Sequence, residues 1–192
     1  VFCLSEMCRY ASVNKKKLHV AFVDFKSAFD AVPRNGLLHI LRNLGIERNT
    51  YHAIESLYRH TEAQALANGV KSDTFTVHRG VAQGCPLSPT LFAVYINSLI
   101  NLVNNSKIGI DMKDGKTPIE ILAYADDIVL LAETNEDLQK IIDIAHKWCE
   151  KWGMKANVSK CGTLAISNTD KPVIYWGYTG SAQHRVHEPS NS

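Results

Sequence analysis

The sequence predicts an α+β domain in which a small antiparallel sheet is backed by helices. Apolar, β-rich runs alternate with helical patterns, without the regular strand–helix–strand repetition of a parallel sheet. An Asn68-Gly69 pair between two strand-like runs is a strong hairpin signal. The 192 residues are 45% hydrophobic and 21% charged, which suits one domain with a real core.

The first part of the chain carries one buried strand and two helices in this interpretation. Residues 19–24 (HVAFVD) form a short, mostly apolar run, as a buried strand requires. Residues 33–44 place leucines at helical spacing, with Pro33 near the start and Gly45 just after the end. Residues 50–59 show the same apolar spacing and predict a second helix.

A hairpin and a long apolar helix follow. The strands of the hairpin are expected at 63–67 and 74–78, on either side of Asn68-Gly69. The helix is expected from residue 88 to about residue 103, because Ser88-Pro89 offers an N-cap followed by proline at the first helical position.

Strands and one more helix are expected next. Apolar runs predict strands at 108–112, 119–124 and 128–132. Thr134 then begins a helix, with Asp137 in place of the usual glutamate of a capping box. That helix ends at Gly153.

The chain changes character after Gly177. Two last strands are expected at 161–166 and 172–176, and the residues that follow Gly177 are polar. We therefore expect residues 1–178 to form the domain and residues 179–192 to be a disordered tail.

Composition excludes several classes of protein without identifying a partner. The net charge of +2 gives no strong argument for an anionic partner. Five scattered cysteines form no C-x-x-C pair, which indicates free thiols and argues against a structural zinc site. No apolar run approaches the ~18 residues of a membrane helix. Because the chain opens with Val1, we expect it to be part of a longer polypeptide.

Two adjacent acids stand between apolar runs in residues 121–132 (ILAYADDIVLLA). The carboxylates of Asp126 and Asp127 repel each other there, which costs stability. A divalent cation removes that cost, and Mg²⁺ prefers carboxylate oxygens together with substrate phosphates. On this segment alone, a plain Asp-Asp turn is an equally good interpretation.

A third acid, Asp24, ends the apolar run 19–24. A carboxylate at the end of a strand can face a hairpin tip on the neighbouring strand. Asp24 and Asp126 would then share two Mg²⁺ ions about 3.5–4 Å apart, the arrangement that clamps in-line phosphoryl displacement. Taken alone, Asp24 is better interpreted as a helix or turn cap.

Four motifs in order resemble those of reverse transcriptases. Residues 124–127 (YADD) resemble the YxDD box, and residues 23–30 (VDFKSAFD) resemble the first catalytic motif. Residues 80–89 (GVAQGCPLSP) resemble the motif between them, in the form typical of LINE-type retroelements. Residues 152–160 (WGMKANVSK) resemble the motif that follows. The chain thus resembles the reverse transcriptase domain of a non-LTR retrotransposon.

This resemblance implies a polymerase palm whose fingers and thumb are largely missing from the chain. The implied activity is RNA-directed DNA polymerisation: dNTPs are added to the 3′-hydroxyl of a DNA primer on an RNA template, with two Mg²⁺ ions or with Mn²⁺ in their place. No membrane partner is implied. The parent polypeptide would carry the fingers, the thumb and an endonuclease region, and would act inside the cell, in the nucleus. The chain alone is expected to polymerise weakly or not at all.

The resemblance also assigns catalytic residues. Asp24, Asp126 and Asp127 match the metal-binding carboxylates. Lys160 matches a lysine proposed to protonate the departing pyrophosphate, although a solvated charge in a turn is an equally good interpretation.

Substrate-binding residues follow from the same motifs. Ser27 and Ala28 match positions whose backbone N–H groups lie near the triphosphate. Phe29 matches an aromatic gate that leaves no room for a ribose 2′-hydroxyl, the alternative being a core phenylalanine. Gln83 and Gly84 match the pair that contacts the nascent base pair, and glycine permits a close backbone approach there.

Other functions stay open at this point. A palm could persist as a non-catalytic relic or scaffold that binds RNA or protein; the missing fingers and thumb favour this, whereas the intact acids oppose it. The palm of an RNA-dependent RNA polymerase is a further alternative. Those enzymes usually have glycine at the position of Tyr124 and lack an aromatic gate, so Tyr124 and Phe29 argue against it.

Overall fold

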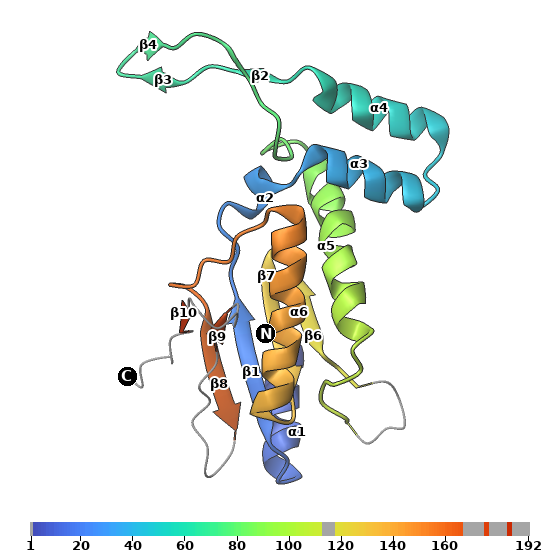
Figure 1. Ribbon diagram of the computed structural model, residues 1–192, viewed down its shortest axis with the longest axis vertical. Helices are drawn as coiled ribbons and strands as arrows, with labels where there is room; N and C mark the ends of the chain where they lie inside the picture. Colours follow the sequence, from blue (N-terminus) through green and yellow to red (C-terminus); the bar gives the residue numbers. More distant parts are fainter. Residues whose placement is uncertain (1, 113–117, 167–174, 177–183, 186–192) are drawn as a thin grey trace. The chain divides into compact units, whose positions relative to one another are not determined.

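A computed structural model describes residues 2–112, 118–166, 175–176 and 184–185 of the chain (Figure 1). The chain divides into two compact units. The sheet unit comprises Val1–Lys26 and Ile96–Ser192, and the insert unit comprises Ser27–Tyr95. Helix α5 (Ser88–Asn104) contributes residues to both units.

The sheet unit is built on a four-stranded antiparallel sheet with the order β6-β7-β1-β8. Its strands are β1 (Leu18–Val23), β6 (Ile121–Tyr124), β7 (Asp127–Ala132) and β8 (Gly162–Ile166). Strand β1 pairs antiparallel with β7 on one side and with β8 on the other. The small antiparallel sheet predicted from the sequence is therefore confirmed.

Helices cover both faces of this sheet. Helix α6 (Asn135–Trp152) packs on β7 and β1. Helix α1 (Phe2–Val13) packs on the other face (Figure 1), where Met7 lies in one buried cluster with Val20 and Leu131. Because β1 is buried on both faces, its sequence is a continuous apolar run instead of an alternating one.

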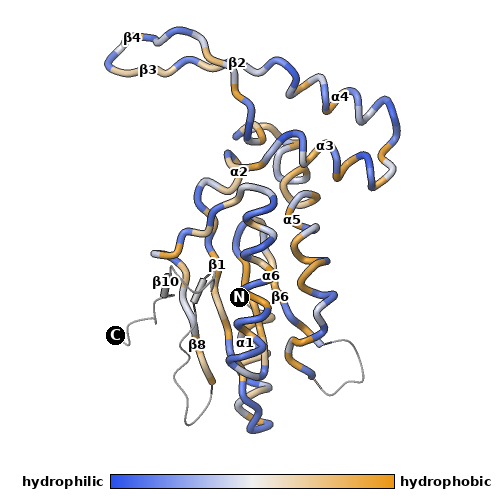
Figure 2. The backbone as a smooth tube through the Cα atoms, viewed as in Figure 1, coloured by the Kyte–Doolittle hydropathy of each residue, from blue (hydrophilic) through white to orange (hydrophobic). Residues whose placement is uncertain are grey.

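Helix α6 has the boundaries that the sequence predicts. The Thr134 side chain accepts a hydrogen bond from the backbone N–H of Asp137 at 3.1 Å, and Gly153 ends the helix with a φ of 65°. Hydrophobic and hydrophilic residues alternate along the helix (Figure 2). The buried residues are Leu138, Ile141, Ile142, Ala145, Trp148 and Cys149. Their helical spacing places one apolar stripe against the sheet.

The sequence interpretation did not include helix α1. Leu4, Met7, Cys8 and Ala11 follow the i, i+3, i+4, i+7 spacing of one helix face, and Met7 and Ala11 are buried. The spacing was therefore present, but it covers only two turns.

The insert unit contains three helices and a hairpin arm. The helices are α2 (Ala28–Ala31), α3 (Arg34–Asn43) and α4 (Arg48–Arg59). The helices predicted at 33–44 and 50–59 are confirmed. Helix α4 begins earlier than predicted because the side chain of Glu47 caps it, accepting from the backbone N–H groups of Asn49 and Thr50.

The hairpin arm contains β2 (Glu62–Ala63), β3 (Leu66–Ala67), β4 (Val70–Lys71) and β5 (Phe75–Thr76). Asn68 and Gly69 both have left-handed backbones, with φ of 50° and 80°. This is the geometry of a two-residue type I′ turn. The pairing of Ala63 with Phe75 falls within the predicted strands 63–67 and 74–78, but the turn joins Ala67 directly to Val70, so the returning side of the hairpin begins earlier than residue 74.

Two further expectations about strands need comment. The strand expected at 108–112 is reduced to one bridge between Ile110 and Ile119. Near the end of the chain, β9 (Tyr175–Trp176) pairs with β10 (His184–Arg185). Residues 172–174, and most of the expected tail at 179–192, lie outside the described residues. Within the described part of the chain, no helix has the length and apolarity to cross a membrane.

Glu120, just before β6, is a buried acid. It is 1% exposed, and its Oε1 atom accepts no hydrogen bond from the described residues. Burial raises the pKa of the Glu120 carboxyl above its ordinary value. The ionised form is thus disfavoured in the folded state, and this acid lowers stability progressively as the pH rises above the ordinary glutamate value.

We predict that Glu120→Gln raises the free energy of unfolding at pH 7 by about 1 kcal/mol, since the amide carries no buried charge. The gain should shrink as the pH falls to 4, where the wild-type carboxyl is mostly protonated in both states. Urea unfolding at the two pH values measures this. Glu62→Gln, at an exposed glutamate, is the control and should change little. Destabilisation by Glu120→Gln at pH 7 would show that the carboxylate has a partner.

Candidate active site

Asp24 lies at the end of β1, beside the hairpin of β6 and β7. The last residue pair between β1 and β7 is Val23 with Ile128. Continuing that antiparallel register by one residue places Asp24 opposite Asp127. Residues directly opposite each other on neighbouring strands have Cα atoms about 4.5–5.5 Å apart. The register therefore brings the backbone positions of two acids close together, although about a hundred residues of sequence separate them.

The third acid occupies the hairpin turn itself. Tyr124 pairs with Asp127, so Ala125 and Asp126 are the two turn residues. Ala125 has a left-handed backbone with a φ of 54°, a conformation that costs a non-glycine residue about 1–2 kcal/mol. Tyr124 is 84% exposed. A left-handed alanine beside an exposed aromatic ring and two acids is the kind of locally costly arrangement that clusters at functional sites.

The segment after α6 is anchored to the backbone of Asp24. The N–H of Asn157 donates to the carbonyl of Asp24 at 2.8 Å, and the N–H of Lys26 donates to the carbonyl of Lys155 at 2.9 Å. Lys160 follows in the same turn, its own N–H donating to the carbonyl of Asn157 at 2.8 Å. The side chain of Lys160 is exposed. The structure thus ties the loop that carries Lys160 to the strand end that carries Asp24.

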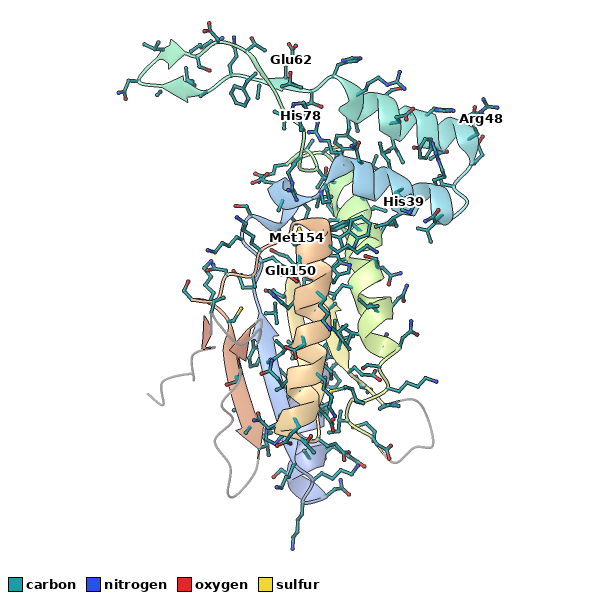
Figure 3. The ribbon with its side chains drawn as sticks, in the orientation of Figure 1. His39, Arg48, Glu62, His78, Glu150 and Met154 are labelled. Atoms are coloured by element: carbon teal, nitrogen blue, oxygen red, sulfur yellow. The ribbon has the colours of Figure 1, made fainter. Side chains whose placement is uncertain are left out.

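A cleft of about 680 Å³ adjoins this loop in the sheet unit. Glu150 and Met154, labelled in Figure 3, lie at its wall at the end of α6. Lys26 and Lys155 line it as well. Lys26, two residues after Asp24, therefore lies on this cleft, whereas Asp24, Asp126 and Asp127 are not among the residues that line it.

The three acids match the donor chemistry of a magnesium site. Asp24 and Asp126 are half-buried, and Asp127 is exposed. No group of three or more histidine, cysteine, aspartate or glutamate side chains among the described residues is arranged to hold a metal ion. Mg²⁺ is usually held by one or two protein carboxylates together with water and substrate phosphates. The residues present fit such a site, completed by substrate, and do not form a closed protein cage.

Other predicted site residues belong to the insert unit, where Ser27, Ala28 and Phe29 begin helix α2. Ser27 precedes the helix with a left-handed backbone, φ 46° and ψ 52°. The ring of Phe29 stacks on the ring of Phe92, with centroids 4.6 Å apart and planes inclined by 15°. Phe92 is 1% exposed. Phe29 therefore has one ring face held against the core and remains half-buried.

Gln83 and Gly84 lie in an exposed loop of the same unit. The Nε2 of Gln83 donates to a carboxylate oxygen of Asp30 at 2.9 Å. Gly84 has a φ of 83°, and a Cβ at this position would meet open space. This is the accessible backbone that the sequence interpretation expects of Gly84.

The structure gathers the predicted residues in two groups. Asp24, Asp126, Asp127 and the Lys160 turn lie together in the sheet unit. Phe29 and Gln83 lie close in the insert unit, since the N–H of Val81 donates to the carbonyl of Phe29 at 3.0 Å.

The sequence interpretation assigned no role to Asp30, Arg34 or Phe92. Arg34 gave a signal, because it is a charged residue on the apolar stripe of its own helix. Asp30 and Phe92 gave none, since their contacts depend on tertiary pairing.

Comparison with known proteins shows the family to which most of the chain is similar. The family described as "Reverse transcriptase (RNA-dependent DNA polymerase)" matches residues 3–180. The chain is 33% identical over 168 residues to the "Retrovirus-related Pol polyprotein from type-1 retrotransposable element R2" of Nasonia vitripennis, covering 88% of this chain and 16% of that protein. It is 28% identical over 173 residues to the "RNA-directed DNA polymerase from mobile element jockey" of Drosophila funebris, covering 87% and 18%.

Solved structures with a similar fold include telomerases. Apo telomerase from Candida tropicalis, truncated from its C-terminal domain, matches with a TM-score of 0.62 at 17% identity, covering 91% of this chain and 36% of that one. Telomerase from the same organism in complex with a fragment of telomeric RNA matches with a TM-score of 0.63 at 14% identity, covering 90% and 30%. At these identities the likeness concerns the fold alone.

Gly80 lies where two segments of the insert unit approach each other closely. Its φ is +89°, and a Cβ there would lie 3.0 Å from both the Cα and the carbonyl oxygen of Asp30. Gly45, at the end of α3, has a similar φ of +70° but faces open space. Substitution of Gly45 therefore tests the cost of the left-handed backbone alone, whereas substitution of Gly80 adds the cost of a steric contact.

We predict that Gly45→Ala lowers the free energy of unfolding by about 1 kcal/mol, through the left-handed backbone alone. Gly80→Ala should lower it by about 3 kcal/mol, because the backbone of Asp30 must also move. Chemical unfolding of both variants measures the difference. Equal costs at the two positions would contradict the close contact.

Proposed function

The chain belongs to the reverse transcriptase (RNA-dependent DNA polymerase) family, and from this premise we propose that it is the palm of an enzyme that copies RNA into DNA during non-LTR retrotransposition. The observation that supports the proposal is the pairing of β1 with β7, which ends at Val23 and Ile128 and leaves Asp24 beside the hairpin whose turn carries Asp126 and Asp127. The chain spans less than a fifth of the length of the relatives described above. The activity proposed is therefore that of a longer polypeptide.

The reaction is a nucleotidyl transfer. The primer 3′-oxygen attacks the α-phosphorus of a dNTP, the bond between that phosphorus and the bridging oxygen breaks, and pyrophosphate leaves. Two Mg²⁺ ions held by Asp24, Asp126 and Asp127, or Mn²⁺ in their place, would neutralise the charge that develops on the phosphate oxygens. The three carboxylates supply the protein's share of that binding site.

Other residues of the four motifs would complete the chemistry. Lys160, on the loop anchored to Asp24, donates a proton to the departing pyrophosphate. The backbone N–H groups of Ser27 and Ala28 lie along the triphosphate. Gln83 and Gly84 contact the nascent base pair, and the exposure of both residues supports that role.

Sugar selection falls to Phe29. Its ring rests on the buried ring of Phe92, so it cannot retreat from an incoming nucleotide without disturbing the core. A ring fixed in this way excludes the 2′-hydroxyl of a ribonucleotide and favours deoxynucleotides.

The proposed partners are an RNA template, a DNA primer and dNTPs. The fingers, thumb and endonuclease regions of the parent polypeptide would complete the enzyme, which would act at a chromosomal target in the nucleus. The lengths of the relatives support a longer parent. We expect the chain alone to extend a primer weakly or not at all. In this family the fingers would bind the triphosphate and the thumb would bind the primer–template, and the chain is expected to lack most of both.

The test is single-nucleotide extension of a DNA primer on an RNA template with Mg²⁺ or Mn²⁺. It compares the chain with an extended polypeptide that restores the fingers and thumb segments on either side. We predict extension by the extended polypeptide, and a loss of at least about a thousandfold in Asp126→Asn, because a metal ligand is removed. Asp73→Asn, at an exposed acid of the insert unit, is the matched control and should retain activity. Silence of the extended wild type would favour the non-catalytic relic.

A second prediction concerns the choice of sugar. Phe29→Val in the extended polypeptide should raise incorporation of ribonucleotides relative to deoxynucleotides by about a hundredfold, because the smaller side chain leaves room for the 2′-hydroxyl. The ratio of kcat/KM values for a matched rNTP and dNTP pair measures it. Phe75→Val, at an exposed phenylalanine of the hairpin arm, is the control. An unchanged ratio in Phe29→Val would show that the ring of Phe29 does not exclude ribonucleotides.

A further inference from the structure

One contact of the insert unit has no counterpart among the motif assignments: the hydrogen bond from Gln83 Nε2 to Asp30 Oδ1, 2.9 Å long. We propose that Asp30 is a positioning residue that holds the side-chain amide of Gln83 in the orientation needed at the nascent base pair. This inference rests on the proposed function, because it assigns a partner to a residue of that substrate site.

Backbone hydrogen bonds fix the distance between Asp30 and Gln83. The N–H of Val81 donates to the carbonyl of Phe29 at 3.0 Å, and the N–H of Gly80 donates to the carbonyl of Val32 at 2.8 Å. These two bonds lie on either side of Asp30 in the sequence, and they hold the residues that lead directly to Gln83. The side chains meet because the two backbones are already joined.

Glycine at position 80 allows this approach. The position of a Cβ on Gly80 lies 3.0 Å from the Cα of Asp30, so any larger residue would push the two segments apart. The contact is therefore built into the backbone and does not depend on a flexible arm reaching across a gap.

Two arginines reinforce the same junction. Arg34, which is buried, donates through Nε to the carbonyl of Gly80 at 2.9 Å and through Nη1 to the carbonyl of Val77 at 2.5 Å. Arg79 donates to the carbonyl of Ala31 at 2.7 Å and 3.1 Å. Hydrogen bonds from charged donors to backbone carbonyls are strong. The two arginines therefore hold the carbonyl of Ala31, next to Asp30, and the carbonyl of Gly80, three residues before Gln83.

The chemistry of the pair selects one orientation of the amide. An ionised carboxylate only accepts hydrogen bonds, whereas the glutamine amide has a donating nitrogen and an accepting oxygen. Asp30 therefore binds the nitrogen side of Gln83 and leaves the oxygen directed elsewhere. Without Asp30 the amide of Gln83 can rotate, so that its nitrogen and oxygen exchange places and the side chain adopts other rotamers.

Stability does not explain the contact. Asp30 and Gln83 are both exposed, and a hydrogen bond between exposed side chains contributes little to folding. The bond nevertheless orders a flexible side chain next to Phe29, in a segment held by two backbone bonds and two arginines. Ordering a substrate-contacting group in advance is a way to strengthen binding of the substrate.

The test is a double-mutant cycle in the extended polypeptide, with single-turnover incorporation of the correct dNTP on a defined primer–template. The variants are Asp30→Ala, Asp30→Asn, Gln83→Ala and Asp30→Ala with Gln83→Ala. Asp73→Ala is the matched control, because it removes the same exposed charge from the same unit. Thermal unfolding of each variant checks that the fold is retained.

We expect Asp30→Ala to raise the dNTP concentration for half-maximal rate about tenfold, with the maximal rate within about twofold of wild type. Asp30→Asn, which keeps the volume and an accepting oxygen, should lie between wild type and Asp30→Ala. In the Gln83→Ala background, Asp30→Ala should add less than about a twofold further loss, since its partner is gone.

Three results would overturn the inference while leaving the proposed function in place: fully additive losses in the double variant, a loss confined to the maximal rate, or an Asp30→Ala variant as active as Asp73→Ala. Silence of the wild-type extended polypeptide would overturn the proposed function, and the positioning role would fall with it. The activity of the wild type therefore separates the two failures.

Discussion

The pairing of β1 with β7 is the constraint on which the candidate site depends. It sets Val23 against Ile128, and only this register brings Asp24 beside Asp127. A slip of one residue would turn the side chains of β1 to the opposite faces of the sheet. Burial of β1 on both faces, with α1 on one and α6 on the other, makes such a slip costly. Packing of the apolar side chains of β1 therefore fixes the backbone position of the acids, and no interaction of the carboxylates themselves is needed for this.

Two locally unfavourable features lie at the end of the sheet. Three carboxylates lie at one end of two strands, and Ala125 in the turn between β6 and β7 holds a left-handed backbone. In the insert unit, Ser27 is left-handed as well, at the start of the segment that carries Phe29. Each departure costs free energy and gives no packing in return. Ser27 and Ala125 both lie within the motifs, whereas the other left-handed non-glycine residues, Lys15, Asn68 and Lys107, lie outside them.

Local signals account for the parts of the fold that the sequence predicts well. The capping residue Thr134 and the glycine at 153 define α6, and Asn68-Gly69 defines the hairpin turn. The acids are recognisable because adjacent carboxylates between apolar runs are poor structural choices. By contrast, the run at 108–112 is as apolar as a strand but finds only one bridge, between Ile110 and Ile119. Whether an apolar run becomes a strand depends on a partner that local sequence does not describe.

The side-chain contacts of Gln83 and Phe29 in the insert unit could not be predicted from the sequence for the same reason. Asp30 and Gln83 are separated by 53 positions, and nothing in either segment alone shows that they meet. The stacking of Phe29 on Phe92 likewise depends on the fold of the insert unit. The motifs suggest which residues carry the proposed chemistry, whereas tertiary pairing shows which contacts hold Gln83 and Phe29 in place.

The central claim is that the end of β1 and the β6–β7 turn form one binding site for a divalent ion. Titration of Mn²⁺ into the ¹⁵N-labelled chain tests it directly, because the paramagnetic ion broadens amide signals close to where it binds. The account predicts that the amides of residues 24 and 125–127 broaden together, and that Asp24→Asn abolishes the effect at both segments. Broadening at one segment alone, or broadening that survives Asp24→Asn, would contradict it.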